Sequence, residues 1–238
     1  MAKMNEEFNF LTERDVEILH LMSKFNGRIF TEVLEKTIWL NYKNAKSQAR
    51  NRLGKLQKKY NLFIKKNTNL QSPRSCFAAS EQLKEIIRTL FDVQLSSSIT
   101  VSPVTVHHTI MEMITFYHLS KIGRKVERTI VKNWSQNHKH TPDLFYEKDG
   151  KKVYVEIERS FKNAGSYNGI FAKIIQDKVD LILYVVENEK RVLQFAKALP
   201  KSEKLRIVSI ETLVKNCSEN GKVGAKTQKE ILKEVKNG

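Results

Sequence analysis

The sequence lacks the features of several large classes of protein. It has only two cysteines, Cys76 and Cys217, which lie far apart and form no CxxC unit. A disulfide framework or a cysteine-based zinc site is therefore not expected, and a cytoplasmic location is the default. No segment approaches the about 18 apolar residues that a membrane helix needs. The N-terminal segment includes acids and no continuous apolar stretch, so it does not predict a secretory signal.

Acidic residues are also scarce. The 238 residues include 42 lysines and arginines against 26 aspartates and glutamates, which gives a formal net charge of +16. The hydrophobic fraction of 40% is enough to form a core, and the length suits one large domain or two small ones. A charge this positive favours a polyanionic partner, with nucleic acid ahead of an anionic membrane surface.

The positive charge is densest between Asn41 and Ser75, where the sequence has ten lysines and arginines and no acid. Apolar residues interrupt this stretch, so we expect a folded basic surface rather than a disordered arm. Residues 44–60 have helical periodicity. One face of this helix is apolar and is expected to be buried: Ala49, Leu53, Leu56 and Tyr60.

The elements around this helix predict a winged helix-turn-helix. Thr12 and Asp15 form a capping-box-like pair at the start of a first helix, and a second helix is expected over Thr31–Trp39. A hairpin and a closing helix follow, with strands at 62–66 and 75–79, a basic wing at 67–74 between them and the helix at 81–91.

Such a domain predicts binding to double-stranded DNA. Short amides and hydroxyls on the exposed face of the third helix suit base edges, and cations further along that helix and on the wing suit phosphates. A lysine-rich helix can also be no more than a solvated face, and the combination of charge, helix order and hairpin favours DNA. The candidate DNA-binding residues are Asn44, Lys46, Ser47, Gln48, Arg50, Asn51, Arg52, Lys55, Lys58, Lys65, Lys66 and Arg74.

A serine-rich segment with Pro103 separates the two halves of the chain. We expect a linker at 94–105 between a DNA-binding domain at 1–93 and a second domain at 106–216, followed by a polar C-terminal tail at 217–238. In the second half, helical and apolar runs alternate, with helices at 106–121, 167–176 and 190–199 and strands at 126–131, 181–186 and 205–210. The expected fold class is α/β: an α+β winged helix followed by a mixed-sheet α/β domain.

Asp149-Gly150 is the strongest hairpin signal in the chain and predicts a two-residue type I′ turn. That turn sets the register of the two strands on either side of it. Phe145 would then face Tyr154 across the hairpin.

The same register places acidic residues together. Asp143 would lie opposite Glu156, and alternation along the second strand puts Glu158 on the same face as Glu156. Carboxylates held this close destabilise each other unless a proton or a cation compensates, and Mg²⁺ or Mn²⁺ is the expected cofactor. The alternative is an exposed sheet face whose acids pair with nearby lysines or arginines.

The helix, strand and hairpin order with Pro142-Asp143 and Glu156-Ile157-Glu158 resembles the PD-(D/E)xK nuclease-like fold. The resemblance implies that Asp143 and Glu156 are metal-binding acids. It also implies that Glu158 stands where the motif has lysine.

Two further roles depend on the same resemblance. Some members of the fold take the lysine from the following helix, and Lys173 is the candidate for that position. Glu112 would match the additional metal-binding acid often found on the first helix, with Glu127 as its rival. Without a lysine at the site, the fold would be catalytically inactive.

The winged helix together with His140-Thr-Pro-Asp and Val155-Glu-Ile-Glu-Arg-Ser is similar to the replication-relaxation family of plasmids and other mobile elements. Leu11-Thr-Glu-Arg-Asp-Val-Glu-Ile-Leu and Arg50-Asn-Arg-Leu-Gly-Lys-Leu resemble that family's N-terminal pattern, and the resemblance covers about residues 10–215. It implies origin binding, and nicking, in plasmid replication or mobilisation.

The sequence-based hypothesis is therefore a sequence-directed, metal-dependent DNA endonuclease or nickase. Asp143, Glu156, Glu158 and Lys173 would form its catalytic site, with Glu158 as a further ligand or as a base that positions water. The first alternative is a non-catalytic origin-binding or regulatory protein with a degenerate nuclease-like domain. A homodimer would imply paired cuts at a two-fold DNA site.

A third hypothesis is a relaxase with a covalent tyrosine nucleophile, for which the candidates are Tyr146, Tyr154 and Tyr167. Relaxases of the kind with two histidine clusters need a histidine triad, and the pairs His107-His108 and His138 with His140 do not supply an obvious one.

Overall fold

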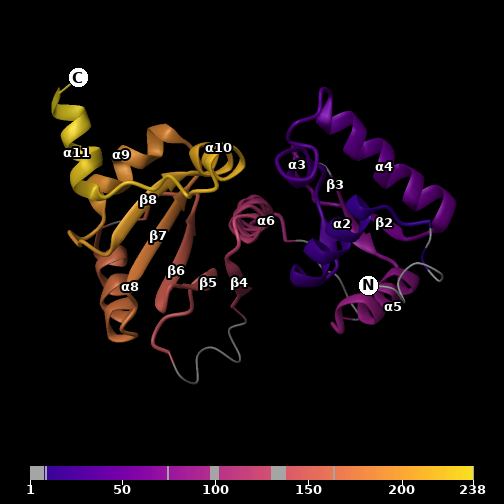
Figure 1. The fold of residues 1–238 in the computed structure, drawn as a ribbon, viewed down its shortest axis with the longest axis horizontal. Coiled ribbons are helices and arrows are strands. Elements are labelled where there is room, and N and C mark those ends of the chain that lie inside the picture. The colour runs from indigo at the N-terminus through magenta and orange to yellow at the C-terminus, as the bar shows by residue number, and fades with distance from the viewer. Residues whose placement is uncertain are drawn as a thin grey trace. The chain divides into compact units, whose positions relative to one another are not determined.

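The computed structural model describes residues 8, 10–73, 75–96, 102–129, 138–162 and 164–237 (Figure 1). The fold class is α/β, as expected, with helices and two separate sheets. The chain divides into two compact units, Met1–Met113 and Ile114–Gly238. This division falls within a helix rather than in the linker predicted at 94–105. No helix in the described residues is long and apolar enough to cross a membrane.

In its described residues, the first unit combines helices with a three-stranded antiparallel sheet in the order β1-β3-β2. The expected helices and hairpin are present, with two differences: the short strand β1 was not expected, and α3 ends at Glu35 instead of Trp39. The elements are α2 (Glu13–Lys24), β1 (Arg28–Ile29), α3 (Thr31–Glu35), α4 (Ala45–Tyr60), β2 (Phe63–Asn67), β3 (Ser75–Ala79) and α5 (Glu81–Phe91).

Asp15 connects the start of α2 to the middle of α4. Its carboxylate accepts hydrogen bonds from the amide and the hydroxyl of Thr12, which completes the predicted capping box. The same carboxylate accepts hydrogen bonds from the Arg52 guanidinium, with Nε 2.8 Å from Oδ1. Asp15 is fully buried, so this ion pair belongs to the interior of the unit.

The second unit contains a five-stranded mixed sheet in the order β4-β5-β6-β7-β8. β4, β5 and β6 are antiparallel neighbours, whereas β7 and β8 run parallel to β6. α6 (Val106–Lys121) spans the division between the units. The other elements are β4 (Lys125–Arg128), β5 (Leu144–Lys148), β6 (Lys151–Glu158), α8 (Ala164–Gln176), β7 (Leu181–Val186), α9 (Glu189–Ala198), β8 (Leu205–Ser209), α10 (Ile210–Asn220) and α11 (Gln228–Asn237).

The β5–β6 hairpin has the predicted register. Phe145 pairs with Tyr154, and Asp149 and Gly150 both have positive φ angles of 51° and 73°, as a type I′ turn requires. Every residue from Val153 to Glu158 is buried. The alternative of an exposed sheet face is therefore wrong, because helices cover the face that carries the acids. Residues of α8, α9 and α11 pack there with Tyr154 and with apolar residues of β7 (Figure 1).

The predicted polar tail at 217–238 is also wrong, because it contains the end of α10 and the whole of α11. Thr227 and Glu230 hydrogen-bond reciprocally at the start of α11, as in a capping box. The Gln228 amide then donates to the carbonyl oxygens of Ala196 and Leu199, which attaches α11 to the end of α9.

Candidate functional site

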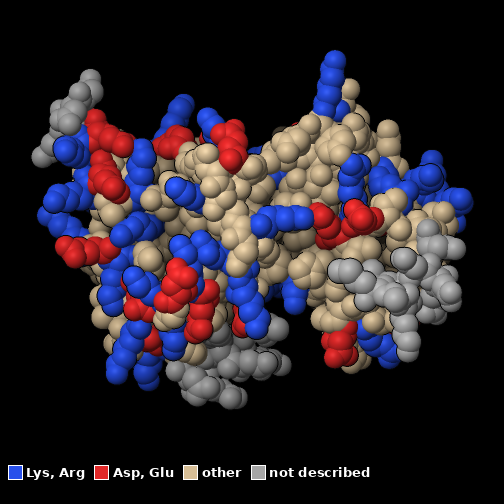
Figure 2. Space-filling view, viewed as in Figure 1, with Lys and Arg blue, Asp and Glu red and all other residues tan. Residues whose placement is uncertain are grey.

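The first candidate site is the exposed face of α4. Ala49, Leu53 and Leu56 are buried, as the periodicity predicts, and Tyr60 is half-buried. The opposite face is exposed and carries amides, a hydroxyl and cations: Asn44, Ser47, Gln48, Arg50, Asn51, Lys55 and Lys58. Over the C-terminal half of α4, the visible side chains in Figure 2 are basic or uncharged. This face offers hydrogen-bonding groups and positive charge together.

A hollow of about 580 Å³ lies beside this face and is lined by α3, α4 and the β2–β3 hairpin. Lys46, Arg50 and Lys65 contribute its positive charge, and Gln71 and Ser75 contribute uncharged polar groups. The hollow therefore combines two cations from the helix with one cation and one amide from the hairpin, an arrangement suited to a large anion.

Glu32 is the one acid among the described residues that line this hollow. Its Oε2 atom is buried and has no hydrogen-bond partner in the described part of the chain. No pattern in the sequence distinguished Glu32 from other acids, because its position at the start of a short helix is common for an acid. The structure adds it as an acceptor on the wall of an otherwise basic hollow.

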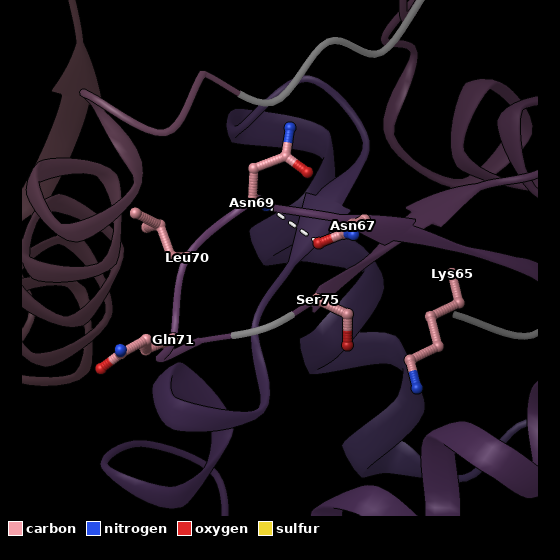
Figure 3. A pocket seen from close by; sticks show the side chains of 6 residues that line it. All are labelled: Lys65, Asn67, Asn69, Leu70, Gln71 and Ser75. Carbon is pink, nitrogen blue, oxygen red and sulfur yellow. Dashed lines mark hydrogen bonds between the residues drawn. The ribbon is translucent and has the colours of Figure 1, made fainter.

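The hairpin itself forms a second hollow of about 680 Å³, shown in Figure 3. The side chains that line it are mainly polar and come from β2, the connecting loop and the start of β3. The Asn67 side chain accepts a hydrogen bond of 2.9 Å from the Asn69 amide, which folds the loop back on the strand. Lys65 and Lys66 are exposed on β2, in the strand predicted at 62–66 just before the wing.

Two of the predicted DNA-binding residues, Arg52 and Arg74, are not included in the exposed face described above. Arg52 is directed to the interior by its ion pair with Asp15, so the structure corrects its assignment to the exposed face. The inward direction of Arg52 was not predictable, because Asp15 lies 37 residues earlier and no local pattern connects the two residues. Arg74 lies outside the described residues.

The second candidate site is the acidic cluster near the C-terminal end of β6. Glu156 and Glu158 are only 8% and 6% exposed. Asp143, just before β5, accepts a hydrogen bond of 2.7 Å from the Ile157 amide through Oδ2, which places it between the two glutamates along β6. The predicted convergence of the three acids is consistent with this geometry.

Each glutamate is hydrogen-bonded to a basic group. Glu156 Oε1 lies 2.8 Å from His140 Nε2, and Glu158 is paired with the Lys162 amine four residues later. Partial burial alone would lower the pKa of Lys162, but the hydrogen bond and the charge of Glu158 raise it. Lys162 is therefore held in its charged form beside the cluster.

Burial raises the pKa of Glu156 to about 7. The hydrogen bond with His140 opposes this rise, and the charges of Asp143 and Glu158 add to it. Tyr184 is the register partner of Glu156 on β7, and its hydroxyl is buried without a hydrogen-bond partner in the described residues. Burial is the main cause that raises the Tyr184 pKa, followed by the charges of Glu156 and Glu158.

The segment that carries His140 is fixed by Asp177, which follows α8. The Asp177 carboxylate accepts hydrogen bonds from the backbone amides of Lys139 and His140, at 2.7 and 3.1 Å. The Tyr154 hydroxyl donates to Asp177 as well, at 3.2 Å, and lies 3.1 Å from Nδ1 of His138. Asp177 thus places the His140 ring against Glu156.

Lys162 was missed in the sequence because the next helix was the expected source of a lysine. Lys173 is exposed on α8, and no described interaction joins it to the three acids. The available signal was the position of Lys162, four residues after the end of β6. A single reversal of the chain there brings its amine to Glu158. His140 was not among the predicted site residues, yet its ring contacts Glu156 directly.

The two candidates for an additional acid are not equivalent. Glu112 is buried in α6 and belongs to the first unit, whereas Asp143 and Glu156 belong to the second. Glu127 is exposed on β4 and pairs in register with Phe145.

The donor chemistry of the cluster can be compared with the needs of a divalent cation. In the described part of the chain, no group of three or more histidine, cysteine, aspartate or glutamate side chains is arranged to hold a metal ion. Mg²⁺ is often bound by one or two carboxylates, with water and substrate phosphate completing its coordination. Asp143 and Glu156 would be the two carboxylates in such a mode, since Asp143 accepts a hydrogen bond from Ile157, the residue next to Glu156.

The three tyrosines considered as nucleophiles are buried. The Tyr154 hydroxyl donates to Asp177, and the Tyr167 hydroxyl accepts a hydrogen bond of 3.0 Å from the Lys162 amide. Burial raises the pKa of Tyr146. These arrangements are typical of structural tyrosines.

No model of a known protein family matches this chain, and no curated protein matches it either.

Proposed function

We propose that the chain is a DNA-binding protein whose first unit binds double-stranded DNA through α4 and the β2–β3 hairpin. The supporting observation is the exposed face of α4, which carries amides and cations while its other face is buried. Asn44, Gln48 and Asn51 would contact base edges, because amides can donate and accept hydrogen bonds there. Lys55, Lys58 and the hairpin lysines would contact phosphates.

The salt dependence of DNA affinity tests this proposal. Replacing Lys55 and Lys58 by glutamine in the full chain removes two charges from α4. Each lost phosphate contact reduces the slope of log K against log salt by about 0.9, so the pair should reduce it by about 2. The measurement is fluorescence anisotropy with a labelled duplex at several salt concentrations.

The matched control replaces Lys190 and Lys197, which are exposed on α9. This variant loses the same charge and should keep the wild-type slope. Equal slopes for all three proteins would contradict the assignment of α4 to the DNA interface.

For the second unit, we propose a divalent-cation-dependent DNA nuclease centre, as in a nickase that acts in plasmid or mobile-element replication. The element order α6-β4-β5-β6-α8-β7 supports the resemblance to the PD-(D/E)xK fold, and the acids near the end of β6 support the placement of the centre. Asp143 and Glu156 would hold Mg²⁺ or Mn²⁺. When bound, the cation would polarise the phosphodiester and promote ionisation of a water.

The chain's own groups would assist in two ways. Lys162 carries positive charge beside the cluster, where it would stabilise the negative charge that develops on the phosphate. Glu158 orients that amine through their ion pair. In this proposal, Lys162 has the role for which the family resemblance made Lys173 the candidate.

A plasmid-nicking assay tests the nuclease proposal. Supercoiled plasmid with Mg²⁺ or Mn²⁺ should become open-circular in the presence of the wild-type protein, and EDTA should stop the reaction. The variant Asp143→Asn should lose nicking while it keeps duplex binding, because Asp143 lies outside the proposed DNA-binding unit. Nicking by this variant at the wild-type rate would contradict the site.

The second candidate is a non-catalytic origin-binding or regulatory protein. The observation in its favour is that Glu156 and Glu158 are already paired with His140 and Lys162. This alternative predicts that the wild-type protein leaves the plasmid supercoiled with either cation and still binds duplex DNA.

A further inference from the structure

A cavity of about 370 Å³ lies in the second unit, at the end of β6 opposite to the acidic cluster. It is lined by the β5–β6 hairpin, by the starts of β6 and β7 and by the loop after α10. Val153 and Leu181, which pair in register, and the neighbouring Leu183 give it an apolar floor. The cavity is thus separate from the acids, which occupy the other end of the same strand.

The rim of this cavity is strongly basic. Among the described residues that line it, Asp149 is the one acid, and its carboxylate lies 3.8 Å from the Lys148 amine. Of the other four cations, Arg124, Lys151 and Lys222 form no ion pair with a carboxylate in the described part of the chain, whereas the Arg206 guanidinium donates to the backbone carbonyls of Glu203 and Leu205. A concave surface with this excess of one charge concentrates ions of the opposite sign.

Arg124 distinguishes the cavity from an ordinary solvated patch of lysines. Its Nε atom is buried and has no hydrogen-bond partner among the described residues. A buried donor without a partner is unfavourable, and such groups in native structures often mark a site for a ligand, an ion or water. Arginine is also suited to two-point hydrogen bonding of phosphate oxygens.

The loop that carries Lys222 is held in a defined position. Gly224 has a φ of 70°, and a Cβ atom there would lie 2.0 Å from the Asn216 side chain of α10. Lys226 and Ile207 exchange backbone hydrogen bonds, which attaches the end of the loop to β8. The loop therefore forms one wall of the cavity and holds Lys222 in a defined position there.

We propose that this cavity binds a phosphate-bearing ligand, with the arginines and lysines on the phosphate and the apolar floor beneath the attached base or sugar. The phosphate can come from a free nucleotide or from the backbone of DNA. Both sources share the chemistry that the cavity recognises, and the arms of one experiment distinguish them.

The test compares a pocket variant with a matched control in the full chain. Lys151→Gln with Lys222→Gln removes two exposed cations of the cavity, and Lys190→Gln with Lys197→Gln removes two exposed cations of α9. All four side chains are exposed, so neither variant is expected to unfold, and thermal melting followed by circular dichroism checks this.

The first arm measures binding of AMP and of inorganic pyrophosphate by isothermal titration calorimetry. A free phosphate-bearing ligand predicts binding that weakens about tenfold in the pocket variant and stays unchanged in the control. This arm requires no DNA binding by the first unit, so it remains informative if that proposal fails.

The second arm measures the salt dependence of affinity for a labelled duplex. A DNA-backbone ligand predicts a slope reduced by about 2 in the pocket variant and not in the control. A positive result in either arm supports the proposal and identifies the source of the phosphate. If the pocket variant and the control behave alike in both arms, the proposal is overturned.

Discussion

The two units differ in how they accommodate buried acids. In the first unit, Asp15 is fully buried and accepts hydrogen bonds from Thr12 and Arg52, so its charge is compensated within the protein. In the second unit, burial raises the pKa of Glu156 to about 7, and the neighbouring Tyr184 hydroxyl has no partner among the described residues. A fully compensated acid is typical of a structural role, whereas incompletely satisfied polar groups are typical of a functional site.

The largest effect is expected from Asp15→Ala. This change leaves the Arg52 guanidinium without its buried partner and removes the capping box of α2. Loss of one member of a buried ion pair costs about 3–5 kcal/mol, and we expect that loss in the free energy of unfolding of the first unit. Urea unfolding followed by circular dichroism measures it.

The two cysteines provide a measurement specific to each unit. Cys76 lies in the first unit and Cys217 in the second, and burial raises the pKa of each thiol to about 11. Asp15→Ala should therefore accelerate labelling of Cys76 by a thiol reagent and leave Cys217 unaffected. Equal acceleration of both thiols would contradict the view that Asp15 stabilises the first unit alone.

Glu158→Gln is the matched comparison in the second unit. Its partner Lys162 is exposed and can turn to water, so the expected cost is about 1 kcal/mol or less. A cost as large as that of Asp15→Ala would remove the distinction between a structural and a functional acid.

An effect smaller than that of Asp15→Ala is expected from Asp177→Ala. The Asp177 carboxylate accepts two backbone hydrogen bonds from the segment that positions His140, and one from Tyr154. We expect a loss of about 2 kcal/mol in the free energy of unfolding, because hydrogen bonds to a charged group are worth about 1.5–3 kcal/mol. If the nuclease proposal holds, plasmid nicking should also fall.

Asp180→Ala is the control for this prediction, because Asp180 accepts a single backbone hydrogen bond, from Lys152 at the other end of β6. Nicking should be unchanged in that variant. Equal effects of the two changes on nicking would mean that Asp177 has no particular role in placing His140.

Local signals made much of this structure predictable. The register of the β5–β6 hairpin followed from two residues able to adopt positive φ, and the buried face of α4 followed from its periodicity. The features that were missed depend on contacts between distant residues. The Arg52 side chain points inward because it pairs with Asp15. Asp177 accepts a hydrogen bond from the backbone amide of His140, which lies 37 residues earlier in the chain.

The acidic cluster was predicted only in part, for the same reason. The register indicated that Asp143, Glu156 and Glu158 converge, but not that helices bury the face that carries them. The partner of Glu158 depended on how the chain turns after β6, which brings Lys162 to it. The capping pair at Thr227 and Glu230 was present in a segment that composition alone assigned to a polar tail.

The smallest effect is expected from Tyr184→Phe, which tests whether the second unit leaves a buried polar group uncompensated. The Tyr184 hydroxyl is buried beside Glu156 with no partner in the described residues, so its removal should leave the free energy of unfolding unchanged or raise it by up to about 1 kcal/mol. Tyr154→Phe is the control: its hydroxyl donates to Asp177, and its loss should cost about 1 kcal/mol. Urea unfolding of both variants gives the comparison. A clear destabilisation by Tyr184→Phe would mean that water or an ion satisfies this hydroxyl, and that the second unit compensates its buried polar groups as fully as the first.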